Sequence, residues 1–170
     1  MRIVKVSRDA FPEINLDGFN RQQKITRIYV RRDDTYVLEE RPGVMDWSID
    51  KKREVAKDLT DNAYISYLAL EEDRIVGFLS LVKELVSERM ILDLIQVDTD
   101  FRGQGIGRML WEKAVEEARI NSAKELYISA CPSEETIRFY KAMGAEVTDK
   151  PIMAIAKDEP DDLQMVCRIG

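Results

Sequence analysis

The sequence contains no histidine and only two cysteines among its 170 residues. Without histidine, the chain has no Ser-His-Asp triad, no Cys-His dyad and no histidine metal ligand. Cys131 and Cys167 lie far apart in the sequence, so they do not form a zinc cluster, and we expect both to be reduced and buried. We therefore expect no metal, and any chemistry must use carboxylates, tyrosine, serine, lysine or backbone groups.

Long apolar runs and a basic surface are also lacking. No run is long enough to span a bilayer, and the first residues have no apolar stretch of the signal-peptide type. The net charge of −6, from 26 basic and 32 acidic residues, argues against nucleic acid as a partner, because phosphate binding needs a basic face. We expect a single domain over residues 1–170, in the cytoplasm, with no membrane partner.

Glycine is scarce, yet three of the eight glycines stand at alternate positions in "FRGQGIGRML", residues 101–110. This segment follows an apolar strand and leads into an amphipathic helix expected over roughly 104–120. The start of a helix leaves backbone N–H groups without partners and has a partial positive charge. Glycines keep side chains away from those N–H groups, so the pattern predicts a turn that binds an anion such as a diphosphate.

Arg102 and Arg108 flank the glycines and add charges that pair with phosphate oxygens. A P-loop is excluded because Gly107 is followed by Arg-Met rather than Lys-Ser/Thr, and the spacing does not fit a dinucleotide fingerprint. The alternative to anion binding is a tight connection in which glycine only permits unusual backbone dihedrals.

The remaining pattern alternates between strand and helix signals and predicts an α/β (α+β) fold, with a mixed and mostly antiparallel sheet flanked by helices. The segment from Met90 to Val97 is apolar at nearly every residue, so we expect it to be a central strand. The predicted strands cover 2–6, the two arms of a hairpin within 24–43, three strands within 63–97, and 125–130, 152–156 and 162–169; the predicted helices cover 48–60, 104–120 and 133–143.

Two blocks of the sequence resemble a known family. The run "LDLIQVDTDFRGQGIGRML" resembles the central motif of the GCN5-related N-acetyltransferases, the GNAT superfamily, with Arg102, Gly105 and Gly107 at its fixed positions. The stretch "SACPSEETIRFYKAMGAE" resembles the next block, in which a helix carries a tyrosine, here Tyr140. The resemblance covers about 63–147. The front third, with its N-terminal β-hairpin, is atypical.

The resemblance implies an acetyl-CoA-dependent N-acetyltransferase, in which the amine of a small molecule or peptide attacks the thioester directly. The identity of the amine and the pairing of two copies into a homodimer stay open. A non-catalytic GNAT-fold protein that binds coenzyme A, or regulates, is the alternative. Many members have an asparagine where this chain has Ser133. The implied coenzyme-binding residues are Ile95, Gln96, Val97, Arg102, Gly103, Gln104, Gly105, Ile106, Gly107, Arg108 and Ser133.

Two side chains are implied as catalytic. Tyr140 is the candidate general acid for the coenzyme A thiolate, and its alternative is a tyrosine that packs on the sheet. Asp93 is the candidate base, because alternation along the strand predicts that it shares a face with Ile95 and Val97. The alternative for Asp93 is a structural ion pair with Arg89 or Lys83.

Overall fold

The computed structural model describes residues 1–170 and is built around a seven-stranded sheet. Its strands are β1 (Arg2–Lys5), β4 (Tyr64–Glu71), β5 (Arg74–Val82), β6 (Arg89–Val97), β7 (Glu125–Ala130), β8 (Glu146–Val147) and β9 (Leu163–Arg168). They lie in the order β1-β4-β5-β6-β7-β9-β8, and every neighbouring pair is antiparallel except β6 and β7, which are parallel. The predicted mixed sheet is therefore confirmed, and β6 is central as expected.

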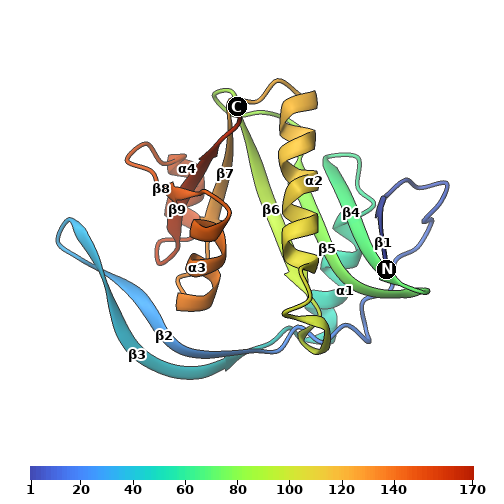
Figure 1. Cartoon of the computed structure of the whole chain (residues 1–170), viewed down its shortest axis with the longest axis horizontal. Coiled ribbons are helices and arrows are strands. Elements are labelled where there is room, and N and C mark those ends of the chain that lie inside the picture. The colour runs from blue at the N-terminus through green and yellow to red at the C-terminus, as the bar shows by residue number, and fades with distance from the viewer.

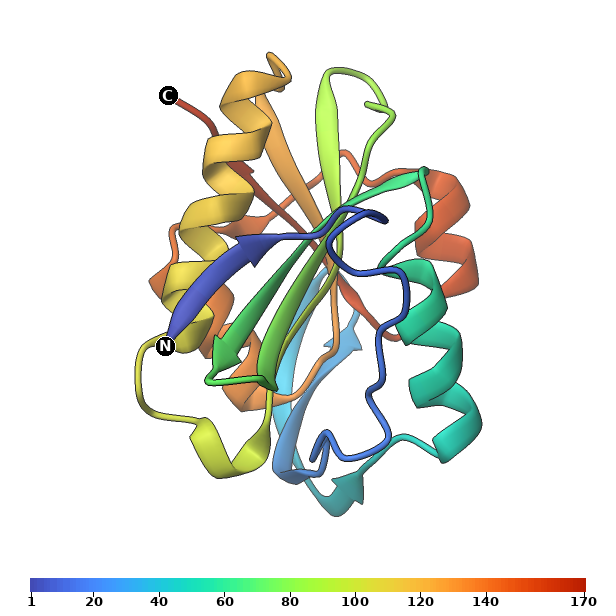
Figure 2. The same ribbon diagram turned by 90° about the vertical axis from the view of Figure 1, so that its right-hand side faces the viewer.

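Helices cover both faces of this sheet (Figures 1 and 2). They are α1 (Ile49–Asp58), the 3-10 turn η1 (Thr99–Phe101), α2 (Ile106–Ile120), α3 (Glu134–Ala142) and α4 (Met153–Asp158). Figure 2 shows α2 on one side of the sheet and α1 and α4 on the other. None of the helices is long and apolar enough to cross a membrane.

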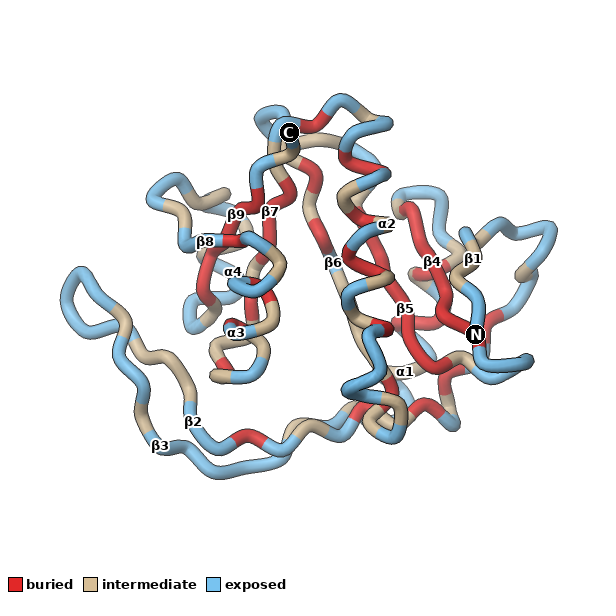
Figure 3. The backbone as a smooth tube through the Cα atoms, in the orientation of Figure 1, coloured by how far each residue is buried: buried red, intermediate tan, exposed pale blue.

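The larger of two apolar clusters lies between the sheet and α2. Leu110, Ala114 and Ala118 recur at helical spacing, are completely buried, and pack with core residues of β5 and β6 such as Leu79 and Met90. A smaller cluster lies under α1 on the opposite face. Figure 3 shows the buried residues concentrated in the central strands and on the inner sides of the helices.

The N-terminal hairpin stands apart from the main sheet. Its strands β2 (Gln23–Arg32) and β3 (Thr35–Met45) form a separate two-stranded sheet. Most of their residues are exposed or half-buried (Figure 3). The hairpin is held to the segment after β7, because the Tyr29 N–H donates to the Pro132 carbonyl at 2.8 Å. Figure 1 shows it running from below β6 to below β7 and α3.

One predicted element is wrong. Residues 152–156 form most of the short helix α4 rather than a strand. The segment is rich in alanine and other good helix formers, and it lies where β9 already has two strand neighbours. The second partner of β9 is β8, a two-residue strand that is too short to give a sequence signal.

Replacing Leu110 with alanine tests the packing between α2 and the sheet. The change should lower the free energy of unfolding by about 2–5 kcal/mol, because it leaves a cavity beside fully buried neighbours. Urea unfolding followed by circular dichroism measures this. Val44→Ala on the exposed hairpin is the control and should change it by less than about 0.5 kcal/mol. A Leu110→Ala protein as stable as this control would contradict the described core.

Candidate active site

The two central strands separate at their carboxyl ends. Pairing between β6 and β7 stops at the partners Leu92 and Ile128, whereas β6 stays paired with β5 as far as Val97. Figure 1 shows β6 and β7 diverging toward the hairpin. The last residues of β6 therefore have a neighbouring strand on one side only.

Backbone N–H groups of β6 face the opened side. The Asp98 N–H donates to the Val76 carbonyl at 2.9 Å, so the alternation of an antiparallel ladder directs the N–H of Gln96 toward β5 as well. The N–H groups of Ile95 and Val97 then point toward β7, beyond the end of its pairing with β6. The side chains of both residues pack against the larger apolar cluster. Their backbone N–H groups, in contrast, face the gap between β6 and β7.

The glycine turn leaves the start of α2 open. Gly105 is the N-cap, with a left-handed φ of +82°, and no side chain caps the helix. The first helical bond runs from the Met109 N–H to the Gly105 carbonyl at 3.1 Å, so the N–H groups of Ile106, Gly107 and Arg108 have no partner within the helix. Gly103, also left-handed at φ +78°, precedes them, and neither glycine has any atom within 4 Å of an added Cβ.

Gly107 has a different reason to be glycine. A Cβ at this position would lie 3.2 Å from Cε2 of Phe139, so the bare backbone lets α3 approach the start of α2 closely. Phe139 precedes Tyr140 on α3, and the ring of Tyr140 packs 6.0 Å from the ring of Trp111 on α2. The third glycine therefore brings the tyrosine helix beside the open helix start.

Arg102 and Arg108 both lie at the surface of the turn. Arg102 donates from Nε to the Val97 carbonyl at 3.2 Å, which leaves its terminal nitrogens free for an anion. Partial burial lowers its pKa, while the nearby Asp98 raises it. Arg108 is exposed and forms no ion pair.

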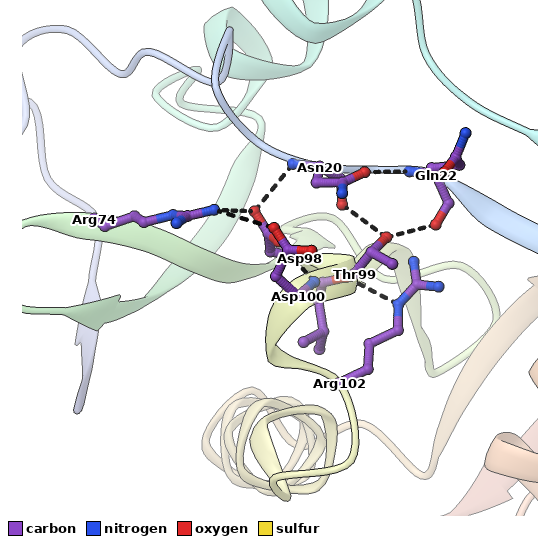
Figure 4. Close-up of polar contacts among 8 residues, drawn as sticks. Asn20, Gln22, Arg74, Asp98, Thr99, Asp100 and Arg102 are labelled. Carbon is purple, nitrogen blue, oxygen red and sulfur yellow. Dashed lines mark hydrogen bonds and ion pairs between the residues drawn. The ribbon is translucent and has the colours of Figure 1, made fainter.

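Asp98 holds this turn in place and was not among the predicted site residues (Figure 4). Its carboxylate is fully buried and accepts from the backbone N–H groups of Asn20 and Asp100, both at 3.0 Å. It also pairs with Nη2 of Arg74 at 3.1 Å. The only sequence signal is an acidic residue at the end of an apolar strand, which does not reveal its partners.

Tyr140 lies on α3 and is 7% exposed. It packs against Phe139 and Trp111, and its hydroxyl is in no hydrogen bond with the protein. Burial raises the pKa of Tyr140 well above its ordinary value, and the Cys131 thiol and the Asp162 carboxyl raise it further. The phenol is therefore neutral and keeps its proton. Tyr140 therefore packs on neighbouring rings and also has a hydroxyl that is available to donate a proton.

Ser133 is the N-cap of α3 and is completely buried. Its hydroxyl accepts from the Thr136 N–H at 3.3 Å and from Nε2 of Gln23 on the hairpin at 3.1 Å. These bonds give the hydroxyl a structural role and link the hairpin to the start of α3.

Asp93 does not lie on the predicted face. Leu81 pairs with Leu92 and Ser80 with Leu94, so Asp93 is the extra residue of a β-bulge. Asp93 lies near Asp58 and Lys51 of α1, whereas Ile95 and Val97 pack on the α2 side. The predicted shared face is therefore wrong, and Asp93 forms no ion pair with Arg89 or Lys83.

Other carboxyl groups surround Asp93 on this face. Asp93 is exposed, yet partial loss of water raises its pKa, and like charges on Asp58 of α1 and Glu159 after α4 raise it further. Ser129 Oγ, near the end of β7, lies 3.0 Å from Glu159 Oε2 and 3.2 Å from Asp162 Oδ2. Burial, followed by Glu159, raises the pKa of Asp162 to about 7.

Two surface cavities of about 650 and 410 Å³ lie elsewhere. The larger lies between the N-terminal loop and β4–β5, and the smaller lies at the opposite ends of β6 and β7. Neither is lined by Tyr140 or by the glycine turn.

Comparison with known proteins agrees with this geometry. Residues 25–145 match the family model described as the acetyltransferase (GNAT) family. The chain belongs to this family. Members of this family transfer an acetyl group from acetyl-CoA. The open start of α2 in this chain offers free backbone N–H groups of the kind that bind a diphosphate.

The relatives of this GNAT chain differ in their named substrates. Peptidyl-lysine N-acetyltransferase YjaB of Salmonella typhimurium is 30% identical over 115 residues, which span 65% of this chain and 64% of that protein. A protein assigned as a streptothricin acetyltransferase from Bacillus anthracis, solved with acetyl coenzyme A, is 14% identical with a TM-score of 0.75 over 100% of both chains. A nourseothricin acetyltransferase is 20% identical, with a TM-score of 0.72 over 99% of this chain and 98% of that one. These two structures show the same fold, front third included.

Gly105→Ala tests the coenzyme turn. The added methyl group faces no other atom but forces a left-handed alanine, so the turn should change its backbone and coenzyme A should bind at least about tenfold more weakly. Isothermal titration measures the affinity. Gly18→Ala is the matched control, because Gly18 is equally open and its φ is not positive. Equal affinity in the two variants would exclude the turn from coenzyme binding.

Proposed function

We propose that this chain transfers the acetyl group of acetyl-CoA to a primary amine of a cationic small molecule or of a peptide. The observation that carries the proposal is that β6 parts from β7 beside the uncapped start of α2. A single extended ligand with a diphosphate at one end and a thioester at the other fits both features. Acetyl-CoA is such a ligand, and it is the acetyl donor of the family.

The coenzyme would be held mainly by backbone. The N–H groups from Gly103 to Arg108 would bind the diphosphate, with Arg102 and Arg108 supplying formal charge. The pantetheine arm would lie along β6 from Ile95 to Val97, with the backbone of Gln96 between them. An N–H of Ile95 or Val97 would donate to the thioester oxygen and stabilise its negative charge during attack. The structural bonds of Ser133 argue for a minor role of its hydroxyl toward the coenzyme.

Tyr140 would complete the reaction on the donor side. As the amine nitrogen forms its bond to the thioester carbon, the carbon–sulfur bond breaks and its electron pair remains on sulfur. The neutral Tyr140 hydroxyl, which has no protein partner, would give its proton to that sulfur. The attacking nitrogen then releases a proton, the Tyr140 phenolate regains one through solvent, and the products are an amide and free coenzyme A.

The acceptor would enter from the face that carries α1 and α4. Asp58, Asp93, Glu159 and Asp162 converge there, and carboxylates attract an ammonium group. The relative named for peptidyl-lysine acts on an amine that is cationic at neutral pH. The amine must lose a proton before it attacks. Asp93 remains a candidate for this base, and Asp162 is a second one because its pKa of about 7 lets it accept a proton near neutral pH.

Tyr140→Phe tests the general acid. The ring and its packing stay, while the donor hydroxyl is lost, so kcat should fall by about 100-fold and coenzyme A affinity should stay within about twofold of wild type. Thiol release during transfer to a panel of amine classes, including lysine peptides and polyamines, measures kcat. Unchanged kcat would remove Tyr140 from the mechanism. Tight coenzyme binding without transfer to any amine would favour the non-catalytic alternative.

A pH profile distinguishes the two candidate bases. If Asp162 accepts the proton, kcat/KM should rise through about pH 7 in the wild type, and Asp162→Asn should remove this limb while Asp93→Asn keeps it. An acidic limb that survives in Asp162→Asn but not in Asp93→Asn would assign the base to Asp93.

Stability gives an independent check on Asp162. Its pKa is higher in the folded chain than in the unfolded one, so its contribution to stability is complete below about pH 4 and is lost as the pH rises through about 7. The stability of Asp162→Asn relative to wild type should therefore increase as the pH rises from 5 to 8. Thermal melts at these two pH values measure the difference, and an equal offset at both would contradict the raised pKa.

A further inference from the structure

Arg21 is a buried cation without a counter-ion. The residue is 5% exposed, its Nε has no hydrogen-bond partner, and none of the ion pairs of the protein includes it. Its one polar side-chain contact is from Nη1 to Oε1 of Gln23 at 3.4 Å, and its guanidinium lies 5.2 Å from the centre of the Trp47 ring. A buried charge without a partner is costly, which points to an anion that is present only during function.

The surroundings of Arg21 connect it to the reaction end of the site. Gln23 also bonds Ser133, the cap of the helix that carries Tyr140. The Cys131 thiol, at the end of β7, lies within electrostatic range of both Arg21 and Tyr140. A second sulfur in this region would therefore lie within electrostatic range of both a cation and a phenol.

The charged neighbours of Arg21 do not neutralise it. Burial and the like charge of Arg102 lower its pKa, and the opposing effects of Cys131 and Asp46 are smaller. Asp46 is exposed and accepts from the Trp47 N–H at 2.7 Å, so it does not pair with the guanidinium. The positive charge of Arg21 stays available inside the protein.

We propose that Arg21 stabilises the negative charge on the coenzyme A sulfur as the thiolate leaves, an inference that rests on the proposed function. The carbon–sulfur bond breaks with its electron pair on sulfur, Tyr140 supplies the proton, and Arg21 transfers none. Its role is a fixed positive charge in an environment of low polarity, where charge interactions are strong.

The anion is assigned to sulfur rather than to a carboxylate of the acceptor. The acceptor face is already lined with carboxyl groups, which repel an acidic substrate. Near Arg21 the lining is polarisable instead: Cys131 Sγ lies 3.8 Å from Met45 Sδ, and the Trp47 ring covers the guanidinium.

The thiol pKa of bound coenzyme A tests this role without knowledge of the acceptor. The protein is saturated with coenzyme A in a Cys131→Ser, Cys167→Ser background, and thiolate absorbance is followed against pH below the range where tyrosine ionises. The bound thiol should have a pKa below that of free coenzyme A in the same buffer. Arg21→Gln and Arg21→Met should each raise the bound value by about one unit.

Arg31→Gln is the matched control, because it removes the same charge from the exposed surface of the hairpin that follows Arg21 and should leave the bound thiol pKa unchanged. Normal coenzyme binding with an unshifted thiol pKa in the cysteine-free background that retains Arg21 would overturn the role of Arg21 while leaving the proposed function intact, even if the Arg21 variants fail to fold. Absence of coenzyme binding would overturn both. A preference for lysine over cadaverine that disappears in Arg21→Gln would reassign Arg21 to an acceptor carboxylate and contradict the proposal.

Discussion

The buried carboxylate of Asp98 is the interaction on which the arrangement of the site depends. It joins three segments that are distant in sequence: the N-terminal segment at Asn20, the start of β5 at Arg74 and its own turn at Asp100. Its backbone N–H continues the ladder between β5 and β6. Because one fully desolvated group makes all these bonds, the end of β6 and the entry to the glycine turn are fixed relative to each other.

This fixed junction gives the two faces of the sheet different chemistry. On the α2 and α3 face, the uncapped helix start, the free N–H groups of β6 and the neutral Tyr140 suit an anionic thioester donor. On the α1 and α4 face, the bulge at Asp93 and the carboxyl groups after α4 suit a cation. In the proposed reaction, the parting of β6 and β7 would let the two reactants meet, so attack on the thioester would not require a large movement of the sheet.

The sequence was sufficient for the parts of the site that depend on local pattern. The central strand, the glycine turn, α2 and the position of Tyr140 on its helix follow from apolar periodicity, backbone requirements and a family motif. The remaining features depend on contacts between distant segments. The bulge that turns Asp93 arises from the register with β5, Asp98 and Arg21 have meaning only through their neighbours, and α4 replaces a predicted strand because β9 already has two partners. Such features give no periodic signal along the chain.

The central claim is that the backbone between Asp98 and α2 binds the diphosphate of coenzyme A. The most direct measurement is a titration of the isotopically labelled protein with coenzyme A, followed through its backbone amide NMR signals. The account predicts the largest changes at the amides of Gly103 to Arg108, followed by Ile95 and Val97, with little change along β1 and β4. Coenzyme binding that shifts other amides and leaves those of the glycine turn in place would contradict it.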